Sequence, residues 1–206
     1  KIYAAKGRPS DNPLIVHIAR MEDLEKIVTG VPKKAKILAE ACWPGPLTMI
    51  LPKSEEVPYE TTGGLDSVAV RYPSHPVAQA LILAAGGFVA APSANTSGRP
   101  SPTTAAHVQE DLTGAVDMIL DGGQVGIGIE STIVDFTEKI PTVLRPGYIS
   151  LEKLKELLGE VKMDKGLLRA DASQRPKAPG MKYRHYAPKA ELTIVEGSTE
   201  YVVAYI

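Results

Sequence analysis

Short apolar runs rich in β-branched residues alternate with helix-type patterns along most of the chain, and this alternation restricts the fold more than any other feature. The runs have the length and composition of strands, and the segments between them carry apolar residues at helical spacing. This mixed order predicts an α/β domain with a mixed sheet, not a sandwich or a bundle. The predicted strands are 14–18, 47–52, 67–72, 88–91, 117–120, 131–136 and 142–145, and the predicted helices are 21–28, 33–42, 75–85, 103–113 and 150–158.

The composition changes after the last of these helices. Residues 160–188 are rich in Lys, Arg and Pro and have no sustained apolar period, which is typical of a linker. Residues 191–196 and 201–206 resume apolar, strand-like runs. We therefore predict a first domain over 1–159, a linker over 160–188 and the start of a second domain over 189–206. The first residue is Lys1 and not Met, residues 1–6 resemble the end of a helix, and 201–206 stops without a cap or turn, so we expect a segment of a longer protein.

Charge and cysteine content exclude several classes of protein. Hydrophobic residues make up 44% of the chain, charged residues 23%, and the formal net charge is −1, which excludes a uniformly basic nucleic-acid-binding surface. The single cysteine, Cys42, cannot form an internal disulfide, which is typical of a reducing compartment. No apolar run approaches the length of a membrane span, and no signal peptide is visible. We expect a cytoplasmic protein that makes no membrane contact.

Common catalytic and phosphate-binding motifs are absent. The Gly-rich run 121–128 lacks the Lys-Ser/Thr ending of a P-loop, and Ser131 stands where the dinucleotide fingerprint requires glycine. The four histidines are scattered without metal-ligand spacing or cysteine partners, so we predict no protein metal site. There is no Gly-x-Ser-x-Gly elbow, and nothing in the pattern demands covalent catalysis.

Two polar segments beside predicted strands suit an anionic ligand. In residues 5–18 the cations Lys6 and Arg8 precede a strand that carries His17, and in residues 91–104 small hydroxyls lie before a helix N-terminus, where free N–H groups favour anions. Arg71 and Arg145 end two further strands. Charge-assisted hydrogen bonds contribute about 1.5–3 kcal/mol each, so together these groups suit a polyanion. Taken singly, each arginine is more simply a solvated surface charge.

The motifs around these cations match a known family. Lys6-Gly7-Arg8 and Ser93-Ala94-Asn95 resemble the signature of the threonylcarbamoyl-AMP synthases, whose catalytic part is the YrdC-like domain. Four further segments also resemble the family: WPGPLTMIL at 43–51, VAVRYPSHP at 68–76, GIESTIVD at 128–135 and LRPG at 144–147. PGMKYRHYAP at 179–188 resembles the linker of two-domain members, which carry a second, Rossmann-like domain. The resemblance implies a YrdC-like open, twisted mixed sheet with flanking helices, preceded by a strand and a Thr/Tyr-containing loop.

The resemblance also implies an activity. Members are nucleotidyltransferases that join L-threonine, bicarbonate and ATP into L-threonylcarbamoyladenylate and pyrophosphate. The product serves N6-threonylcarbamoyladenosine modification at position 37 of tRNA, through downstream threonylcarbamoyl transferase machinery. A Mg²⁺ ion bridging the ATP phosphates is expected, held largely by the nucleotide and water.

By position, the resemblance assigns catalytic roles to Lys6 and Arg8. It also implies that Tyr186 of the linker covers the nucleotide, and the dense cluster of linker side chains between two prolines favours a lid over a passive tether. The expected ATP contacts are Arg8, Asn12, Ser67, Ser93, Asn95, Ser101, Arg145 and Tyr186; the expected threonine contacts are His17, Arg71, the backbone at Ala91, and Ser131; the lid residues are Met181, Tyr183, His185 and Tyr186.

Two alternatives stay open. YrdC-like domains also occur in carbamoyltransferases that act through a carbamoyl-adenylate, although the HYAP-type linker and the lack of zinc-binding cysteines favour the threonine enzyme. The other is an RNA-binding module, against which the near-neutral charge and the aromatic content of 5% count. Its basic patch, or a weaker RNA contact of the enzyme, would use Lys33, Lys34, Lys36, Arg175, Lys177, Lys182 and Arg184.

Overall fold

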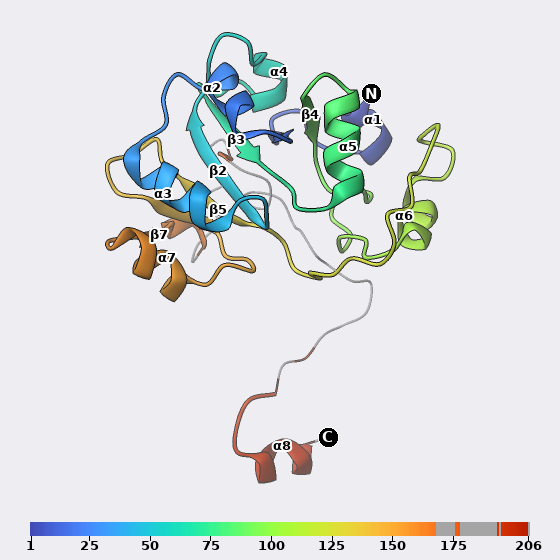
Figure 1. The fold of residues 1–206 in the computed structure, drawn as a ribbon. Coiled ribbons are helices and arrows are strands. Elements are labelled where there is room, and N and C mark those ends of the chain that lie inside the picture. Colours follow the sequence, from blue (N-terminus) through green and yellow to red (C-terminus); the bar gives the residue numbers. More distant parts are fainter. Residues whose placement is uncertain (168–175, 178–192, 194, 206) are drawn as a thin grey trace.

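The computed structural model describes residues 1–167, 176–177, 193 and 195–205. Its described strands form one seven-stranded sheet in the order β4-β1-β3-β2-β5-β6-β7 (Figure 1). The strands are β1 (Ile15–Ile18), β2 (Leu47–Pro52), β3 (Ser67–Arg71), β4 (Phe88–Ala91), β5 (Thr132–Asp135), β6 (Thr142–Arg145) and β7 (Lys162–Met163). The helices are α1 (Ile2–Lys6), α2 (Leu24–Ile27), α3 (Lys33–Cys42), α4 (Tyr59–Thr62), α5 (Pro76–Ala84), α6 (Ala105–Leu112), α7 (Leu151–Leu158) and α8 (Thr199–Tyr205), with short 3₁₀ turns at Met21–Asp23 and Lys165–Leu167.

The sheet is mixed, as the alternating sequence pattern predicts. β1 is parallel to β3 and antiparallel to β4, and β3 is antiparallel to β2. On the other side β2 is parallel to β5, β5 is antiparallel to β6, and β6 is parallel to β7. The parallel pairs need long crossover connections, which the helices supply. The mixed α/β fold with flanking helices is thereby confirmed.

One face of the sheet forms the main core. In β2 the side chains of Leu47, Met49 and Leu51 join a large apolar cluster, whereas Ile50 belongs to a smaller cluster on the opposite face. This is the two-residue period of a strand that is buried on both sides. The main core face is covered by α3 and α7, which contact each other (Figure 1) and bury Leu38 and Leu154 completely.

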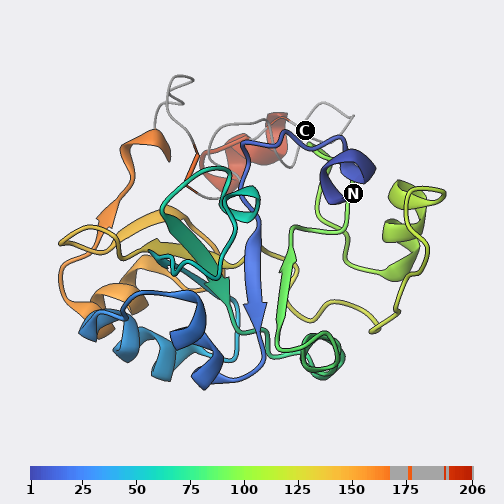
Figure 2. The same ribbon diagram turned by 90° about the horizontal axis from the view of Figure 1, so that it is seen from above.

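The opposite face carries a row of polar side chains across three strands. His17 of β1 pairs with Arg71 of β3, and Arg71 pairs with Thr48 of β2. Paired residues project from the same side of a sheet, and Ile15, two residues before His17, belongs to the smaller cluster. The row therefore lies on the face away from α3 and α7. Figure 2 shows β1 beside β4, which extends this face to the sheet edge.

Local sequence signals account for several helix ends. Gly7 ends α1 at φ 60°, a left-handed conformation that glycine adopts without steric cost. Ser150 begins α7 by accepting the Lys153 N–H through its side chain, and Gly159 follows the helix, as predicted for 150–158. Thr104 caps α6 in the same way, through the His107 N–H.

Two predicted strands are wrong. Residues 117–120 form no strand; Met118 and Leu120 are 75% and 56% exposed in an irregular segment, near which the Val125 N–H bonds to the Thr103 carbonyl at 3.0 Å. An apolar run becomes a strand only where its backbone finds a pairing partner. Of the expected strand 201–206, the described residues 201–205 are not a strand, because they lie in the helix α8 (Thr199–Tyr205). Short apolar runs fit both periods, and periodicity alone does not separate them.

The predicted linker is described in part. β7 lies within it and pairs with β6. Farther along, Pro176 is buried, and the Lys177 ammonium lies 2.9 Å from the carboxylate of Asp135, whose side chain is 2% exposed. This ion pair attaches the linker to β5. Residues 179–188, with Tyr186 and the rest of the predicted lid, lie outside the described residues, and of 191–196 the three described residues are not in a strand.

A helix that crosses a bilayer needs about 20 predominantly apolar residues. None of the helices within the described ranges is long and apolar enough to cross a membrane.

Candidate functional site

A cleft of about 1160 Å³ opens on the sheet face that carries the polar row. Its floor comes from the strands, through Ile15, His17, Arg71 and Ala91. Its walls come from residues 92–94 and 100–105, which lead from β4 into α6, from residues 116–131, and from the turn 145–147 after β6. The irregular segment that had been predicted as a strand therefore forms a wall of this cleft.

The cleft brings together many of the predicted site residues. All four predicted threonine contacts line it: His17, Arg71, Ala91 and Ser131. Three predicted ATP contacts also line it, namely Ser93, Ser101 and Arg145. The remaining predicted residues that the structure describes are not among the lining residues; these are Lys6, Arg8, Asn12, Ser67 and Asn95. The ligand roles of both groups stay predictions.

Arg145 and Ser131 form a rigid pair at one end of the cleft. The Arg145 guanidinium donates from Nε and Nη2 to the Ser131 carbonyl at 3.1 and 3.0 Å, and from Nη2 to Ser131 Oγ at 2.9 Å. Ser131 Oγ also lies 2.8 Å from Thr48 Oγ1 in β2. Gly147 permits this packing, because a Cβ there would lie 2.7 Å from the Ser131 carbonyl carbon. The Arg145 guanidinium is thus held in place at the end of β6.

Sequence reasoning did not single out Glu130, the acid beside this pair. Its Oε2 lies 3.4 Å from Arg145 Nη2, and its Oε1 accepts a hydrogen bond from the Ser101 hydroxyl. Glu130 therefore connects the segment 100–105 to the turn after β6. Thr48 was missed as well, although both residues stand inside segments that carry the family resemblance. The available signals were that Glu130 directly precedes the predicted contact Ser131 and that Thr48 lies in the predicted strand 47–52.

His17 is held neutral beside a cation. Its Nδ1 lies 3.0 Å from the Ile15 carbonyl, which can only accept, so this nitrogen carries the proton. Burial, and then the neighbouring Arg71 charge, lower the pKa of His17 to about 4. Arg71 itself donates from Nε to the Gly45 carbonyl at 3.2 Å. At neutral pH the charge of this pair therefore resides on Arg71.

The two signature motifs contact each other directly. The buried Lys6 ammonium donates to the carbonyls of Ser93 and Asn95, and lies 3.4 Å from Asn95 Oδ1. Burial, and then the nearby Arg8, lower the pKa of Lys6 to about 8. Ser97 completes the junction, because its N–H bonds to the Lys6 carbonyl at 2.9 Å. The end of α1 and the loop after β4 therefore form one unit.

Arg8 and Arg145 are not solvated surface charges. They are 7% and 8% exposed, and the Arg8 guanidinium donates to the carbonyls of Asn12 and Pro13 at 3.2 and 2.7 Å. Asn12 is 1% exposed, and within the described part of the chain its side-chain Nδ2 and Oδ1 have no hydrogen-bond partner. A buried amide without partners costs free energy, so this side chain needs a polar partner beyond the described residues.

Family models match nearly the whole chain. Residues 1–147 match the Sua5, YciO and YrdC model, which is described as telomere recombination. The chain belongs to the Sua5–YciO–YrdC family. Residues 149–205 match the model of the C-terminal domain of threonylcarbamoyl-AMP synthase. That second match begins before α7, whose Leu154 and Leu158 are buried in the main core of the first sheet.

Relatives within the family carry a consistent name. The chain is 52% identical over 202 residues to threonylcarbamoyl-AMP synthase of Pyrococcus abyssi, covering 98% of this chain and 59% of that protein. It is 53% identical over 201 residues to threonylcarbamoyl-AMP synthase of Bacillus subtilis, covering 97% and 58%. The crystal structure of P. abyssi Sua5 complexed with L-threonine has a TM-score of 0.94 at 51% identity, covering 99% of this chain and 60% of that one. The chain thus spans about three fifths of the length of these Sua5 relatives.

The state of His17 gives a direct test of the site electrostatics. We predict that its ring stays neutral until the pH falls to about 4. Because the unfolded-state pKa is about 6.5, the unfolded chain takes up the proton first, and folding stability falls as the pH drops from about 6.5 towards 4. Histidine ¹H–¹⁵N NMR titration measures the pKa of the His17 ring. The variant His17→Gln identifies the His17 resonance, and its folding stability should fall less than that of the wild type between about pH 6.5 and pH 4. A His17 ring that titrates near 6.5 would contradict the described burial beside Arg71.

Proposed function

We propose that the protein is a threonylcarbamoyl-AMP synthase that forms L-threonylcarbamoyladenylate and pyrophosphate from L-threonine, bicarbonate and ATP. The observation that carries the proposal is that His17, Arg71, Ala91 and Ser131 line one cleft together with Arg145. The chain that holds them is 51% identical to a Sua5 protein solved with L-threonine. The names of the curated relatives support the same activity. The product would be used in the cytoplasm by transferase machinery that modifies tRNA.

The strand floor suits the amino acid. Arg71 is anchored through Nε on the Gly45 carbonyl, and its other N–H groups suit a forked pair with the threonine carboxylate. The neutral His17 adds no second cation, so it allows the threonine amino group to approach without charge repulsion. Ser131 Oγ, which Arg145 and Thr48 hold in place, would offer a further polar contact to the threonine.

The loop side suits the triphosphate. Residues Ser101 to Ala105 line the cleft on the way into α6, and the first N–H groups of a helix favour a phosphate. Arg145, which contacts the same Glu130 carboxylate as Ser101, supplies a positive charge to the cleft lining. Lys6 and Arg8 supply two more beside the 93–95 loop, and Asn12 adds a side-chain amide that has no hydrogen-bond partner among the described residues. A nucleotide lying along this wall would place its α-phosphate towards the amino acid on the strand floor.

The reaction needs positioning more than acid–base catalysis. The threonine amine attacks bicarbonate, water leaves, and a carbamate forms. A carbamate oxygen then attacks the α-phosphorus, the bond from that phosphorus to the β-phosphate bridging oxygen breaks, and pyrophosphate leaves. Displacement at phosphorus depends on in-line geometry and on neutralising charge on the oxygens. Arg145, Lys6 and Arg8 would neutralise that charge, and the fixed Arg71 would hold the attacking molecule.

Magnesium would accompany the ATP. Among the residues that the structure describes, no group of three or more His, Cys, Asp or Glu side chains could hold a metal ion. We expect the phosphates and water to supply most of the ligands, as is common for Mg²⁺ at nucleotide sites. When bound, the ion would neutralise part of the phosphate charge, while the protein cations orient the chain of phosphates.

Of the basic residues of the RNA-binding alternative, the four that the structure describes do not line the cleft; these are Lys33, Lys34, Lys36 and Lys177. Lys33 and Lys36 are exposed on α3, which covers the opposite face of the sheet. Lys177 is paired with Asp135 and also lies 3.4 Å from Glu138. Any RNA contact through these residues would therefore be separate from the chemistry we propose.

The activity is tested by pyrophosphate release with the full-length protein. We expect release from ATP and Mg²⁺ only when L-threonine and bicarbonate are both present, with threonylcarbamoyladenylate detected by mass spectrometry. Release that requires carbamoyl phosphate and not threonine would favour the carbamoyltransferase alternative. Absence of release in both mixtures, from protein shown to be folded, would overturn both enzymatic proposals.

The substitution Arg71→Lys tests whether Arg71 contributes to threonine binding and not to ATP binding. Lysine keeps the charge but loses the fork, so we predict threonine affinity about tenfold weaker or more, with ATP affinity nearly unchanged. Isothermal titration calorimetry with each ligand measures both constants. Arg20→Lys, at an exposed position outside the cleft lining, is the matched control and should leave both affinities unchanged. If the Arg71 variant loses ATP affinity equally, Arg71 belongs to the nucleotide or to folding.

The linker provides a further prediction for this activity. Lys177 fixes the linker on β5 just before residues 179–188, and we propose that those residues cover the cleft and protect the mixed anhydride from water. Tyr186→Ala, and deletion of 179–188, should raise ATP consumed per threonylcarbamoyladenylate trapped. Tyr201→Ala, at a tyrosine 78% exposed in α8, is the control. An unchanged product yield per ATP in the variants would reduce the linker to a tether.

A further inference from the structure

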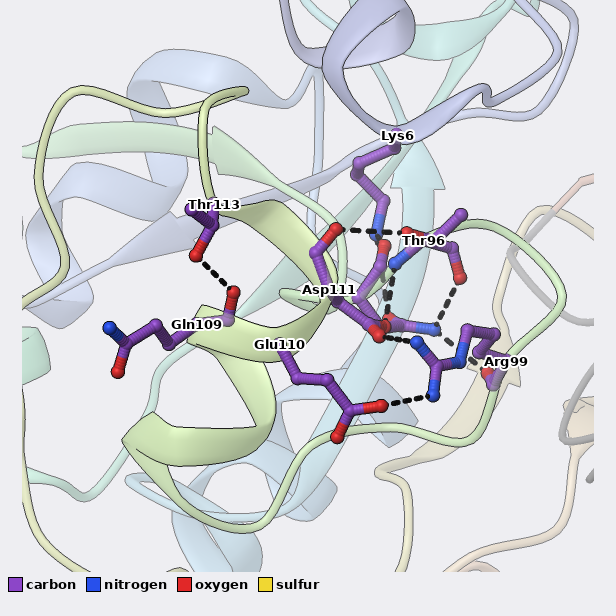
Figure 3. Close-up of polar contacts among 8 residues, drawn as sticks. Lys6, Thr96, Arg99, Gln109, Glu110, Asp111 and Thr113 are labelled. Carbon is purple, nitrogen blue, oxygen red and sulfur yellow. Dashed lines mark hydrogen bonds and ion pairs between the residues drawn. The ribbon is translucent and has the colours of Figure 1, made fainter.

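The loop that carries Ser93 and Asn95 is held from two sides. On one side the Lys6 ammonium binds the carbonyls of Ser93 and Asn95. On the other side lies α6, and its contribution comes from Asp111, a residue outside the motifs of the family resemblance. Figure 3 shows the Asp111 side chain directed at Thr96 and Arg99, with the Lys6 side chain reaching the same loop.

Asp111 uses both carboxylate oxygens on this loop. Oδ2 accepts the Thr96 N–H at 3.0 Å, and Oδ1 accepts from Arg99 Nη1. The Asp111 carbonyl also accepts from Thr96 Oγ1 at 3.2 Å, and the side chain is only 6% exposed. A buried carboxylate that accepts a backbone N–H and a guanidinium fixes the backbone next to Asn95 with charge-assisted bonds.

Helix stability does not explain an acid at this position. Asp111 is the last residue but one of α6, where the carboxylate faces the negative end of the helix dipole. Aspartate is also a weak helix former. Its charge is therefore balanced by the groups of the loop and not by the helix that carries it.

The same carboxylate acts on Lys6. The charged groups that bear on the Lys6 ammonium are Arg8, from its own segment, and Asp111, from α6. Burial and Arg8 lower the pKa of Lys6, and Asp111 raises it. Asp111 therefore favours the ammonium form, which is the form that donates to the two loop carbonyls.

We propose that Asp111 is a positioning residue of the nucleotide site: it fixes the loop 93–97 through Thr96 and Arg99 and is the opposing charge for Lys6. The inference rests on the proposed function, because it assigns the loop and Lys6 to ATP. Asp111 itself is not placed in contact with substrate.

The neighbouring residue supplies a matched control. Glu110 pairs with the same arginine, with its Oε1 at 2.9 Å from Arg99 Nη2, but its side chain is 65% exposed. Glu110→Gln and Asp111→Asn each remove one negative charge from the end of α6 and one ion pair from Arg99. Asp111→Asn alone alters the group that accepts the Thr96 N–H and that bears on Lys6.

The experiment compares both variants with wild type in the full-length protein. Pyrophosphate release is measured over about pH 6.5 to 9, and ATP affinity by calorimetry at the ends of that range. For Asp111→Asn we expect kcat/KM for ATP to fall about tenfold or more, and the high-pH limb to move to lower pH, because Lys6 loses the charge that raises its pKa. Glu110→Gln should stay near wild type in both respects.

Thermal unfolding checks that each variant is folded, and Asp111→Glu extends the test. Glutamate keeps the charge on a longer side chain, so we expect the wild-type pH limb with a lowered kcat/KM. Equal losses of kcat/KM in Glu110→Gln and Asp111→Asn, or a loss in Asp111→Asn without movement of the high-pH limb, would overturn the proposal.

Wild-type protein that binds ATP but releases no pyrophosphate would count against the proposed function, and the ATP affinity of Asp111→Asn would still decide the role of Asp111. Wild-type protein that binds no ATP would overturn both.

Discussion

The register between β1, β3 and β2 is the constraint on which the rest of the cleft depends. It aligns His17 with Arg71 and Arg71 with Thr48, so that the polar groups form one row on one face. A slip of one residue would send that row into the main core. The alternating neighbours Val16, Val68 and Val70, buried in that core, oppose such a slip because their apolar side chains would be exposed by it. The packing of apolar side chains on one face of the sheet thus fixes the position of the polar row on the other face.

Charge distribution in the cleft follows from burial as much as from residue type. Lys6, Arg8 and Arg145 are almost fully buried and are held mainly by carbonyl oxygens, which satisfy their donors without cancelling their charge. Glu130 offsets part of that charge between the walls, and His17 adds none at neutral pH. These contacts fix Arg145 in the cleft lining, and Lys6 and Arg8 outside that lining, before a ligand arrives. Such preorganisation is what an anionic substrate needs, since no reordering has to accompany binding.

Sequence reasoning predicted the six longer strands and most helices because each apolar run there found a partner. It failed at 117–120 and 201–206, where the same local pattern had no pairing strand among the described residues. The site residues came from the resemblance to the family, since no local pattern reveals that Lys6 contacts a loop 87 residues away. Asp111 and Glu130 were missed for a related reason. Acids are common on helix ends and loops, and only the fold shows that these two are turned inward.

The two walls of the cleft differ in how freely they can change during evolution. The floor and the Arg145 turn are part of the ladder of the sheet, where an insertion would disturb the pairing of several strands at once. Residues 116–130 instead cross the surface without regular structure, and such segments accept changes of length and sequence at little cost. A change in that segment alone would therefore reshape one wall of the cleft, while the strand floor and the paired loops remain as they are.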